Sequence, residues 1–342
     1  MTLLASSPPA AVPPQREAPG FFWRTLIALV IGFALPVLTC VGIILVSAWA
    51  LQILASGSKS SSFNFDASGG SGPAVAVIRV EGVIASGEST PFGGGATAGA
   101  KTIIANIEKA KNDKDVKAIL LAVDSPGGGV NASDQIYHAL KNAGKPVVVI
   151  MGDVAASGGY YISMASDWII ANPNTLTGSI GVISEFPNAA GLLDKVGVQL
   201  VVITSGPRKD IGSPYREMTD DERAYWKKII DETYASFVAI VAEGRRMTVD
   251  EVKPLADGGV FTGRQALDLK LVDQLGYEED AVAKAAELGG IPGKPRLIEY
   301  KNEPTFLQLL TRSMAQRSLV PSLAEIMDWV GHPSLSARWI GP

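Results

Sequence analysis

Histidine and cysteine are scarce in this chain of 342 residues, which contains two histidines and one cysteine. Metal sites built from several histidine or cysteine ligands are therefore excluded, and no intrachain disulfide can form. An imidazole general base has only two candidates, His138 and His332. The sequence thus disfavours a serine nucleophile activated by histidine, although it leaves His138 open as a candidate.

The chain also has no excess of positive over negative charge. The net charge is −4 and the pI is about 5.4, which argues against nucleic acid as a partner. No glycine-rich stretch ends in the Gly-Lys-Ser/Thr sequence of a Walker loop, which argues against phosphate binding. A hydrophobic content of 47% with 36 glycines is typical of a globular protein.

Charged residues are absent between Leu26 and Leu54, a run longer than the roughly 20 apolar residues that cross a bilayer. We predict a single membrane-spanning anchor at 21–55. Arg16 and Arg24 precede the run, so the positive-inside rule places the N-terminus in the cytoplasm. The rest of the chain is then expected on the periplasmic side of the inner or plasma membrane.

The segments on either side of this anchor are predicted to be flexible. Residues 1–20 form a tail rich in proline and alanine, and residues 56–72 form a linker rich in serine and glycine. A cleaved signal peptide is the competing interpretation, because Ala48-Trp49-Ala50 has the small-x-small form of a cleavage site. The apolar run exceeds the usual signal core of roughly 7 to 15 residues, which favours a retained anchor.

Strand and helix patterns alternate after the linker. Apolar runs predict strands, and apolar residues at helical spacing predict helices. The expected strands are 74–80, 118–123, 147–151 and 198–203, and the expected helices are 98–110 and 130 to about 142. This alternation implies βαβ units, a mostly parallel sheet and an α/β domain over residues 73–300. Ligands of such sheets collect beyond the carboxyl ends of the strands.

Capping signals of the form Ser/Thr-x-x-Glu/Gln predict three further helices. The signal at 219–222 opens a long amphipathic helix, and those at 248–251 and 262–265 open shorter ones. Residues 301–342 are predicted to form a C-terminal helical segment, with helices at 306–314 and 319–330. This segment either docks on another subunit or the membrane surface, or is a frayed tail.

Ser157 lies between the strand predicted at 147–151 and a helix that begins near Tyr160, and Gly158 and Gly159 follow it. Such a turn exposes a hydroxyl beside the unpartnered first amides of a helix, where the helix dipole adds positive potential. An acyl-transfer oxyanion needs this environment. Serine is equally a favoured N-cap, and Gly-Gly packs a helix end closely. This stretch alone leaves both interpretations open.

A serine nucleophile needs a group that takes its proton, and a lysine of lowered pKa is the next candidate after histidine. Lys209 follows the strand predicted at 198–203 and precedes a turn rich in glycine, serine and proline. Arg208 would lower the pKa of Lys209, whereas a nearby Asp210 would raise it. A lone lysine in a loop is otherwise a solvated surface charge.

Two further glycine-rich stretches have open interpretations. The sequence Asp124-Ser125-Pro126-Gly127-Gly128-Gly129 follows a predicted strand and is either a tight turn or the source of a second oxyanion amide. The sequence Gly178-Ser179-Ile180-Gly181 by itself predicts only a turn.

Six segments in order resemble the signal peptide peptidase A family of serine proteases, which shares its core with Clp protease and crotonase. The resemblance covers about residues 74–276. The segments that carry it are VIRVEGVI at 77–84, LLAVDSPGGGV at 120–130, GDVAASGGYYISMASD at 152–167, TGSIGVI at 177–183, KDIGSPYREMT at 209–219 and FTGRQALDLKLVD at 261–273.

The resemblance implies a Clp protease/crotonase-like core in which Ser157 is the nucleophile and Lys209 the general base. It also implies that the Ser179 hydroxyl orients the lysine amine and that the Gly128 and Gly158 amides bind the oxyanion. The family acts on signal peptides and other apolar peptides without a metal or organic cofactor. Its single-domain members form membrane-tethered homo-oligomeric rings in which serine and lysine can come from neighbouring subunits.

A membrane-anchored serine endopeptidase is therefore the leading hypothesis, and two others stay open. A crotonase-like acyl-CoA enzyme would use the same amides to hold an enolate, but an external location counts against it because coenzyme A thioesters are cytoplasmic. A non-catalytic scaffold of the same fold would lack the dyad, and both Ser157 and Lys209 are present.

Overall fold

The computed structural model describes residues 63–65, 72–89, 97–300 and 335–338. All of these residues belong to one unit of the chain, Ser62–Pro342. The predicted tail, anchor and most of the linker lie outside the described residues, as do the helices predicted at 306–314 and 319–330. Among the helices that are described, none is long and apolar enough to cross a bilayer.

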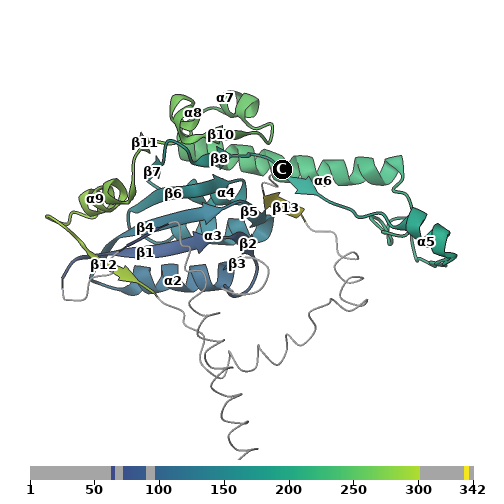
Figure 1. Ribbon diagram of the computed structural model, residues 1–342, viewed down its shortest axis with the longest axis horizontal. Helices are drawn as coiled ribbons and strands as arrows, with labels where there is room; N and C mark the ends of the chain where they lie inside the picture. Colours follow the sequence, from purple (N-terminus) through teal and green to yellow (C-terminus); the bar gives the residue numbers. More distant parts are fainter. Residues whose placement is uncertain (1–62, 66–71, 90–96, 301–334, 339–342) are drawn as a thin grey trace, which may run out of the picture. The chain divides into compact units, whose positions relative to one another are not determined.

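A largely parallel sheet lies at the centre of this unit (Figure 1). The strand order is β10-β8-β6-β4-β1-β12. Strand β7 lies off this path and pairs with both β6 and β11. Every pair is parallel except β10 with β8. The strands are β1 (Ala74–Glu81), β4 (Val116–Ser125), β6 (Val147–Ala156), β7 (Trp168–Ala171), β8 (Leu176–Gly178), β10 (Val260–Thr262), β11 (Gln274–Leu275) and β12 (Arg296–Glu299). The predicted α/β fold with a mostly parallel sheet is confirmed.

Both faces of the sheet are buried, which explains why its central strands are apolar without interruption. Ile119, Leu121 and Val123 of β4 point into one apolar cluster, and their neighbours Leu120 and Ala122 point into the other. The first cluster packs against α2 (Ala100–Asn112), α3 (Val130–Lys141), α4 (Gly158–Ser163) and α6 (Asp220–Arg245). The second packs against α9 (Glu278–Leu288).

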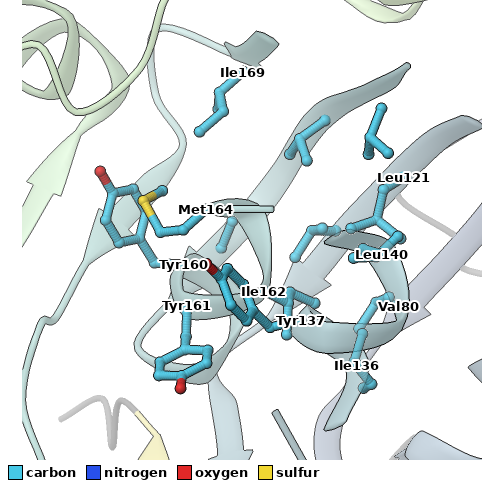
Figure 2. Packing of buried hydrophobic residues seen from close by; sticks show 14 of the residues in the cluster. Val80, Leu121, Ile136, Tyr137, Leu140, Tyr160, Tyr161, Ile162, Met164 and Ile169 are labelled. Atoms are coloured by element: carbon cyan, nitrogen blue, oxygen red, sulfur yellow. The ribbon is translucent and has the colours of Figure 1, made fainter. Parts of the chain in front are cut away.

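Figure 2 shows the part of the first cluster that lies beneath α4. Tyr161 and Ile162 of α4 pack beside Ile136 and Leu140 of α3. The Tyr160 hydroxyl is buried and donates to the Leu271 carbonyl oxygen at 2.8 Å. The short helix α4 is therefore held on several sides by the core.

A second, smaller sheet lies beside the first, in the order β3-β2-β5-β13-β9. Its strands are short and were not predicted from the sequence. They are β2 (Val83–Ala85), β3 (Thr97–Gly99), β5 (Gly127–Gly129), β9 (Ile183–Ser184) and β13 (Leu335–Arg338). Residues 335–338 thus form a strand, so the prediction of a helical segment is wrong for this part of 301–342.

The capping predictions are confirmed. Thr219 begins α6 with a reciprocal pair of bonds: Glu222 N donates to Thr219 Oγ1 at 3.3 Å, and Thr219 N donates to Glu222 Oε2 at 3.0 Å. The same arrangement opens α7 (Val249–Val252) at Thr248 and α8 (Gly263–Asp268) at Thr262. A 3-10 helix, η1 (Lys253–Leu255), follows α7.

The strand predicted at 198–203 is wrong. These residues form no strand in the structure, and the side chains of Val201 and Ile203 are 88% and 92% exposed. They follow α5 (Ala190–Val196), which lies beside the N-terminal end of α6 and away from the large sheet (Figure 1). A β-branched run favours a strand only where another strand pairs with it, and none of the described strands does so here.

A buried ion pair ties the end of α6 to the segment that follows α8. Arg245 Nη2 lies 2.7 Å from Asp273 Oδ1, and the Arg245 side chain is 8% exposed. Asp273 Oδ2 also accepts from Arg245 Nη1 at 3.0 Å and from Ile169 N at 2.8 Å. We expect Arg245→Met to lower the free energy of unfolding by about 3 kcal/mol, because it leaves a mostly buried carboxylate without its cation. Urea denaturation measures this change.

The control is Lys141→Met, which removes a pair with Glu243 in which both side chains are exposed. This variant should lose less than about 1 kcal/mol. Equal losses in the two variants would contradict a special role for the Arg245–Asp273 pair.

Candidate active site

Ser157 occupies a sharp turn between β6 and α4. Its φ of 53° and ψ of −114° are unusual for a residue with a side chain, and such backbone strain clusters at functional sites. The turn is fixed on both sides, because Ser157 N donates to the Gly178 carbonyl oxygen at 2.8 Å and Tyr161 N donates to the Ser157 carbonyl oxygen at 2.8 Å. Ser157 is buried, with 1% of its surface exposed.

The structure separates the two interpretations of Ser157. Ser157 stands at the N-cap position of α4, but its side chain accepts no capping hydrogen bond. A cap alone therefore does not explain the residue. Its hydroxyl lies instead at the carboxyl end of a central strand, where ligands of parallel sheets collect.

Gly159 allows α4 to pack against the end of β4. A Cβ at this position would lie 2.8 Å from the Ser125 carbonyl oxygen, closer than side chains tolerate. Gly158, the first residue of α4, is buried, and the amides of a first helical turn have no partner within the helix. The turn thus presents main-chain donors beside the Ser157 hydroxyl.

The glycine-rich turn after β4 lies against β2. Ser125 Oγ donates to the Gly82 carbonyl oxygen at 2.6 Å and accepts from Gly127 N at 3.1 Å, which fixes the start of β5. Gly128 pairs with Ile84, and a Cβ on Gly128 would lie 1.9 Å from the Ile84 carbonyl oxygen. Only glycine therefore fits there. Strand β5 also contacts α4, so Gly128 and Gly158 come from neighbouring elements.

Ser179 is the neighbour of Ser157 on the adjacent strand. Strands β6 and β8 are parallel and pair Ala156 with Gly178, so the next residues, Ser157 and Ser179, leave the sheet side by side. Neighbouring strands lie about 4.8 Å apart. Ser179 also has a positive φ, of 49°, and its N–H donates to the Gly259 carbonyl oxygen at 2.7 Å. Four of the predicted site residues, Ser157, Ser179, Gly128 and Gly158, thus lie at one end of the sheet.

No described contact joins Lys209 to this group within one chain. It lies in an exposed turn, and its neighbour Arg208 pairs with Asp221 at 3.4 Å and lies 4.7 Å over the Tyr225 ring, at the start of α6. The helix after Ser157 instead meets α6 at Phe237, whose ring lies 5.0 Å from that of Tyr161. Phe237 comes 16 residues after Asp221 in α6, which is about 24 Å along the helix axis.

The described contacts of His138 do not support it as the general base for Ser157. His138 lies on α3 with its side chain 63% exposed, and it pairs with Asp134 at 3.6 Å. Its ring packs against Tyr137. No described contact joins it to Ser157, and His332 lies outside the described residues. Among the residues that the structure describes, no group of three His, Cys, Asp or Glu side chains is arranged to hold a metal ion.

The strand β13 lies beside the glycine-rich turn, and no sequence pattern predicted this pairing. It pairs antiparallel with β5, with Ser336 opposite Gly129 and Ala337 opposite Gly128. On its other side Ser336 pairs with Ile183 of β9, also antiparallel. An extended segment of the chain thus lies between β5 and β9 and contacts α4, the helix that follows Ser157.

A cleft of about 740 Å³ opens beside α4. Its lining combines apolar and aromatic residues such as Tyr161, Trp226 and Phe237 with polar and acidic ones such as Asp134 and Glu232. Trp226 Nε1 is buried and has no hydrogen-bond partner among the described residues. The cleft therefore offers a ligand both apolar surface and hydrogen-bonding groups.

Several known proteins are similar in sequence to most of this domain. The profile of peptidase family S49 matches residues 139–291, and the profile of Clp protease matches residues 95–176. A putative protease of Synechocystis is 41% identical over 261 residues, which cover 75% of this chain and 90% of that protein. The chain belongs to peptidase family S49.

Other S49 relatives support the same assignment. Protease 4 of Salmonella typhi is 40% identical to this S49 chain over 261 residues, and this chain spans 41% of its length. The putative signal peptide peptidase SppA of Enterococcus faecium is 39% identical over 241 residues, which cover 69% of this chain and 70% of that protein. The resemblance to the signal peptide peptidase A family is confirmed, and the parallel sheet agrees with the predicted Clp protease-like core.

The clash at Gly128 generates a test of the turn after β4 in this S49 peptidase. We expect Gly128→Ala to lower the hydrolysis of a denatured protein substrate by at least about a hundredfold, because the new Cβ must push β5 away from Ile84. Gly129→Ala is the matched control, since its Cβ would meet nothing closer than 3.8 Å. Similar activity of the two variants, with circular dichroism showing both folded, would refute the importance of the Gly128 backbone.

Proposed function

We propose that this S49 peptidase is a serine endopeptidase that uses a Ser157–Lys209 dyad to hydrolyse peptide bonds in signal peptides or other apolar peptides. The observation that carries the proposal is the strained turn at Ser157, which holds an uncapped hydroxyl beside Ser179 at the end of the parallel sheet. Membership of a peptidase family supports peptide-bond hydrolysis as the reaction in which this hydroxyl takes part.

The proposed reaction begins when the neutral amine of Lys209 takes the proton of the Ser157 hydroxyl. The Ser157 oxygen attacks the peptide carbonyl carbon, and the amides of Gly128 and Gly158 stabilise the negative charge on the carbonyl oxygen. The lysine then gives its proton to the departing amine as the peptide bond breaks. Water, deprotonated by the same lysine, hydrolyses the acyl-serine and restores the enzyme. The Ser179 hydroxyl orients the lysine amine between these steps.

We infer that the lysine comes from a neighbouring copy of the chain in a homo-oligomeric ring. The residue before Lys209 pairs with Asp221 of α6, whereas the helix after Ser157 meets α6 at Phe237, about 24 Å further along its axis, and this arrangement favours a dyad shared between copies. An exposed apolar run at 198–203 supports this inference, because soluble surfaces seldom leave such runs uncovered. A second copy that packed against residues 198–203 would also lie close to the adjacent Lys209 turn.

The substrate is proposed to bind as an extended strand between β5 and β9. The chain's own strand β13 occupies this position and pairs with both. Main-chain hydrogen bonds of this kind bind peptides of many sequences, and neighbouring pockets select the side chains. The cleft beside α4 offers the aromatic surface of Tyr161, Trp226 and Phe237 to a large apolar side chain of the substrate. We further propose that the segment 21–55 anchors the enzyme in the membrane, with the peptidase domain on the periplasmic side.

Two inactive variants test the shared dyad. Ser157→Ala and Lys209→Ala should each abolish hydrolysis of an unfolded protein or a signal-like peptide, while leaving the thermal unfolding of the chain unchanged. Co-expressed and purified together through different tags, the two variants should recover part of the activity, because some contacts then join an intact serine to an intact lysine. Full activity of Lys209→Ala alone would eliminate lysine as the base, and a wholly inactive mixture would argue for a dyad within one chain.

The C-terminal strand provides a second test. Deletion of residues 335–342 should increase the rate of peptide hydrolysis several-fold and lower KM, because it removes the segment that pairs with β5 and β9. The measurement is a steady-state assay with a fluorogenic peptide. An unchanged KM would show that peptides bind elsewhere.

A further inference from the structure

Three residues from the predicted linker, Phe63-Asn64-Phe65, dock on the peptidase domain. The Phe63 side chain is 5% exposed and lies in the second apolar cluster, on the face of the large sheet that α9 covers. The Phe65 ring packs against the same cluster and stacks on the Phe63 ring, with 5.9 Å between the two ring centroids. Two aromatic side chains from a stretch of mainly serine and glycine are thus held by the folded domain. We call the three residues the linker clip.

Polar contacts hold the main chain of the linker clip. Asn64 N donates to the Glu278 carboxylate, at 3.0 Å from Oε1 and 3.1 Å from Oε2. Arg79 Nη1 donates to the Phe63 carbonyl oxygen at 3.1 Å, and Arg79 Cζ lies 5.4 Å from the centroid of the Phe65 ring. Hydrogen bonds with a charged partner are the stronger ones, and a cation over an aromatic ring is attracted to it. The clip is therefore held by β1 and α9 as well as by the burial of its rings.

These contacts lie near the edge of the large sheet at which its parallel strands end. Arg79 is close to the end of β1, and Glu278 follows the end of β11. A Cβ on Gly152 of β6 would lie 3.0 Å from Phe63 Cζ, so this ring covers β6 five residues before Ser157. The linker clip and Ser157 thus lie near the same edge, which we call the carboxyl edge.

Without the linker clip, the linker would join the domain at the opposite edge of the sheet. Strand β1 begins at Ala74, which pairs with Val116, the first residue of β4. Arg79, which contacts the clip, lies about 17 Å further along β1. Docking of the clip therefore moves the attachment point of the linker from the edge where the strands begin towards the carboxyl edge.

Docking also shortens the part of the linker between the predicted anchor and the domain. Residues 56–72 would connect them if the clip were not docked, whereas residues 56–62 connect them when it is. A flexible chain of 17 residues has an r.m.s. length of about 23 Å, and one of seven residues about 15 Å. The clip thus keeps the domain closer to its anchor and leaves it less freedom to turn.

We propose that the linker clip fixes the tether of the membrane anchor near the carboxyl edge of the sheet, so that the edge with Ser157 faces the bilayer. The inference rests on the proposed anchor at 21–55. It assigns the clip's aromatic pair an interaction surface on the chain's own domain, made by the second apolar cluster, Arg79 and Glu278.

The test measures how far two labelled positions lie from a bilayer. The full chain with Cys40→Ser is inserted into phosphatidylcholine vesicles that contain acceptor lipids, and a donor dye is attached at Lys101→Cys or Lys114→Cys. Both lysines are exposed, and they lie at opposite ends of α2, about 20 Å apart. Position 114 comes just before the start of β4, so position 101 is nearer the carboxyl edge. We expect more energy transfer from position 101 than from position 114.

Removal of the linker clip should reverse this order. In the double variant Phe63→Ser with Phe65→Ser, the linker joins the domain at Ala74, so position 114 should show the greater energy transfer. Phe63→Leu with Phe65→Leu is the matched control, because leucine side chains keep the apolar contact, and it should retain the wild-type order. Circular dichroism checks that each variant is folded.

Two insertions decide the question if the serine variant does not fold. Ten glycine and serine residues inserted between Gly57 and Ser58 lengthen the tether from about 15 Å to about 23 Å and should lower energy transfer from both positions. The same insertion between Gly69 and Gly70 lies between the clip and β1. It should leave energy transfer unchanged, because the docked clip and not this segment connects the domain to the anchor.

The outcomes separate the linker clip from the anchor. Equal losses of energy transfer from the two insertions, in a chain that floats with the vesicles, would overturn the clip and leave the anchor standing. A full chain that stays in solution when the vesicles are floated would overturn the anchor and this inference together. A loss from the first insertion alone would support the inference, and none of these results depends on the Ser157–Lys209 dyad.

Discussion

The parallel pairing of β6 with both β4 and β8 is the constraint on which the site depends. The register places Ala155 opposite Ser125 on one side and Ala156 opposite Gly178 on the other. It shifts between Val123 and Ser125, and Asp124 bridges the irregularity by accepting from Val154 N at 3.0 Å. Three chain segments therefore end together, and Ser157, Ser179 and the glycine-rich turn meet because their strands stop at matched positions.

Strained backbone at this edge persists because its surroundings leave no alternative. Ser157 and Ser179 both have positive φ values, which cost of order 1–3 kcal/mol each for residues with side chains. The turn at Ser157 is anchored by its own N–H and carbonyl group, and Tyr160 and Ile162 just beyond it are fully buried in the first apolar cluster. Tight packing under α4 thus stabilises a turn that an isolated peptide would not adopt.

The sequence predicted the parts of the fold whose signals are local. Unbroken apolar runs marked the central strands, and Thr219 with Glu222 marked the start of α6. What it missed depends on partners distant along the chain: the run 198–203 has strand composition but no paired strand, and β13 forms only because β5 and β9 lie on either side of it. The sequence singled out Ser157 but left open whether it was a nucleophile or only a helix N-cap. The structure disfavours the cap, because the Ser157 side chain makes no capping hydrogen bond.

The length of α6 has a consequence for how the enzyme would be switched on. The Lys209 turn contacts the start of α6, and the helix after Ser157 packs against α6 at Phe237, so under the proposed shared dyad a lone chain would not bring the two residues together. A newly made copy would then be harmless to the proteins around it. Under that proposal, proteolysis would begin only once enough copies of the chain had accumulated to meet one another.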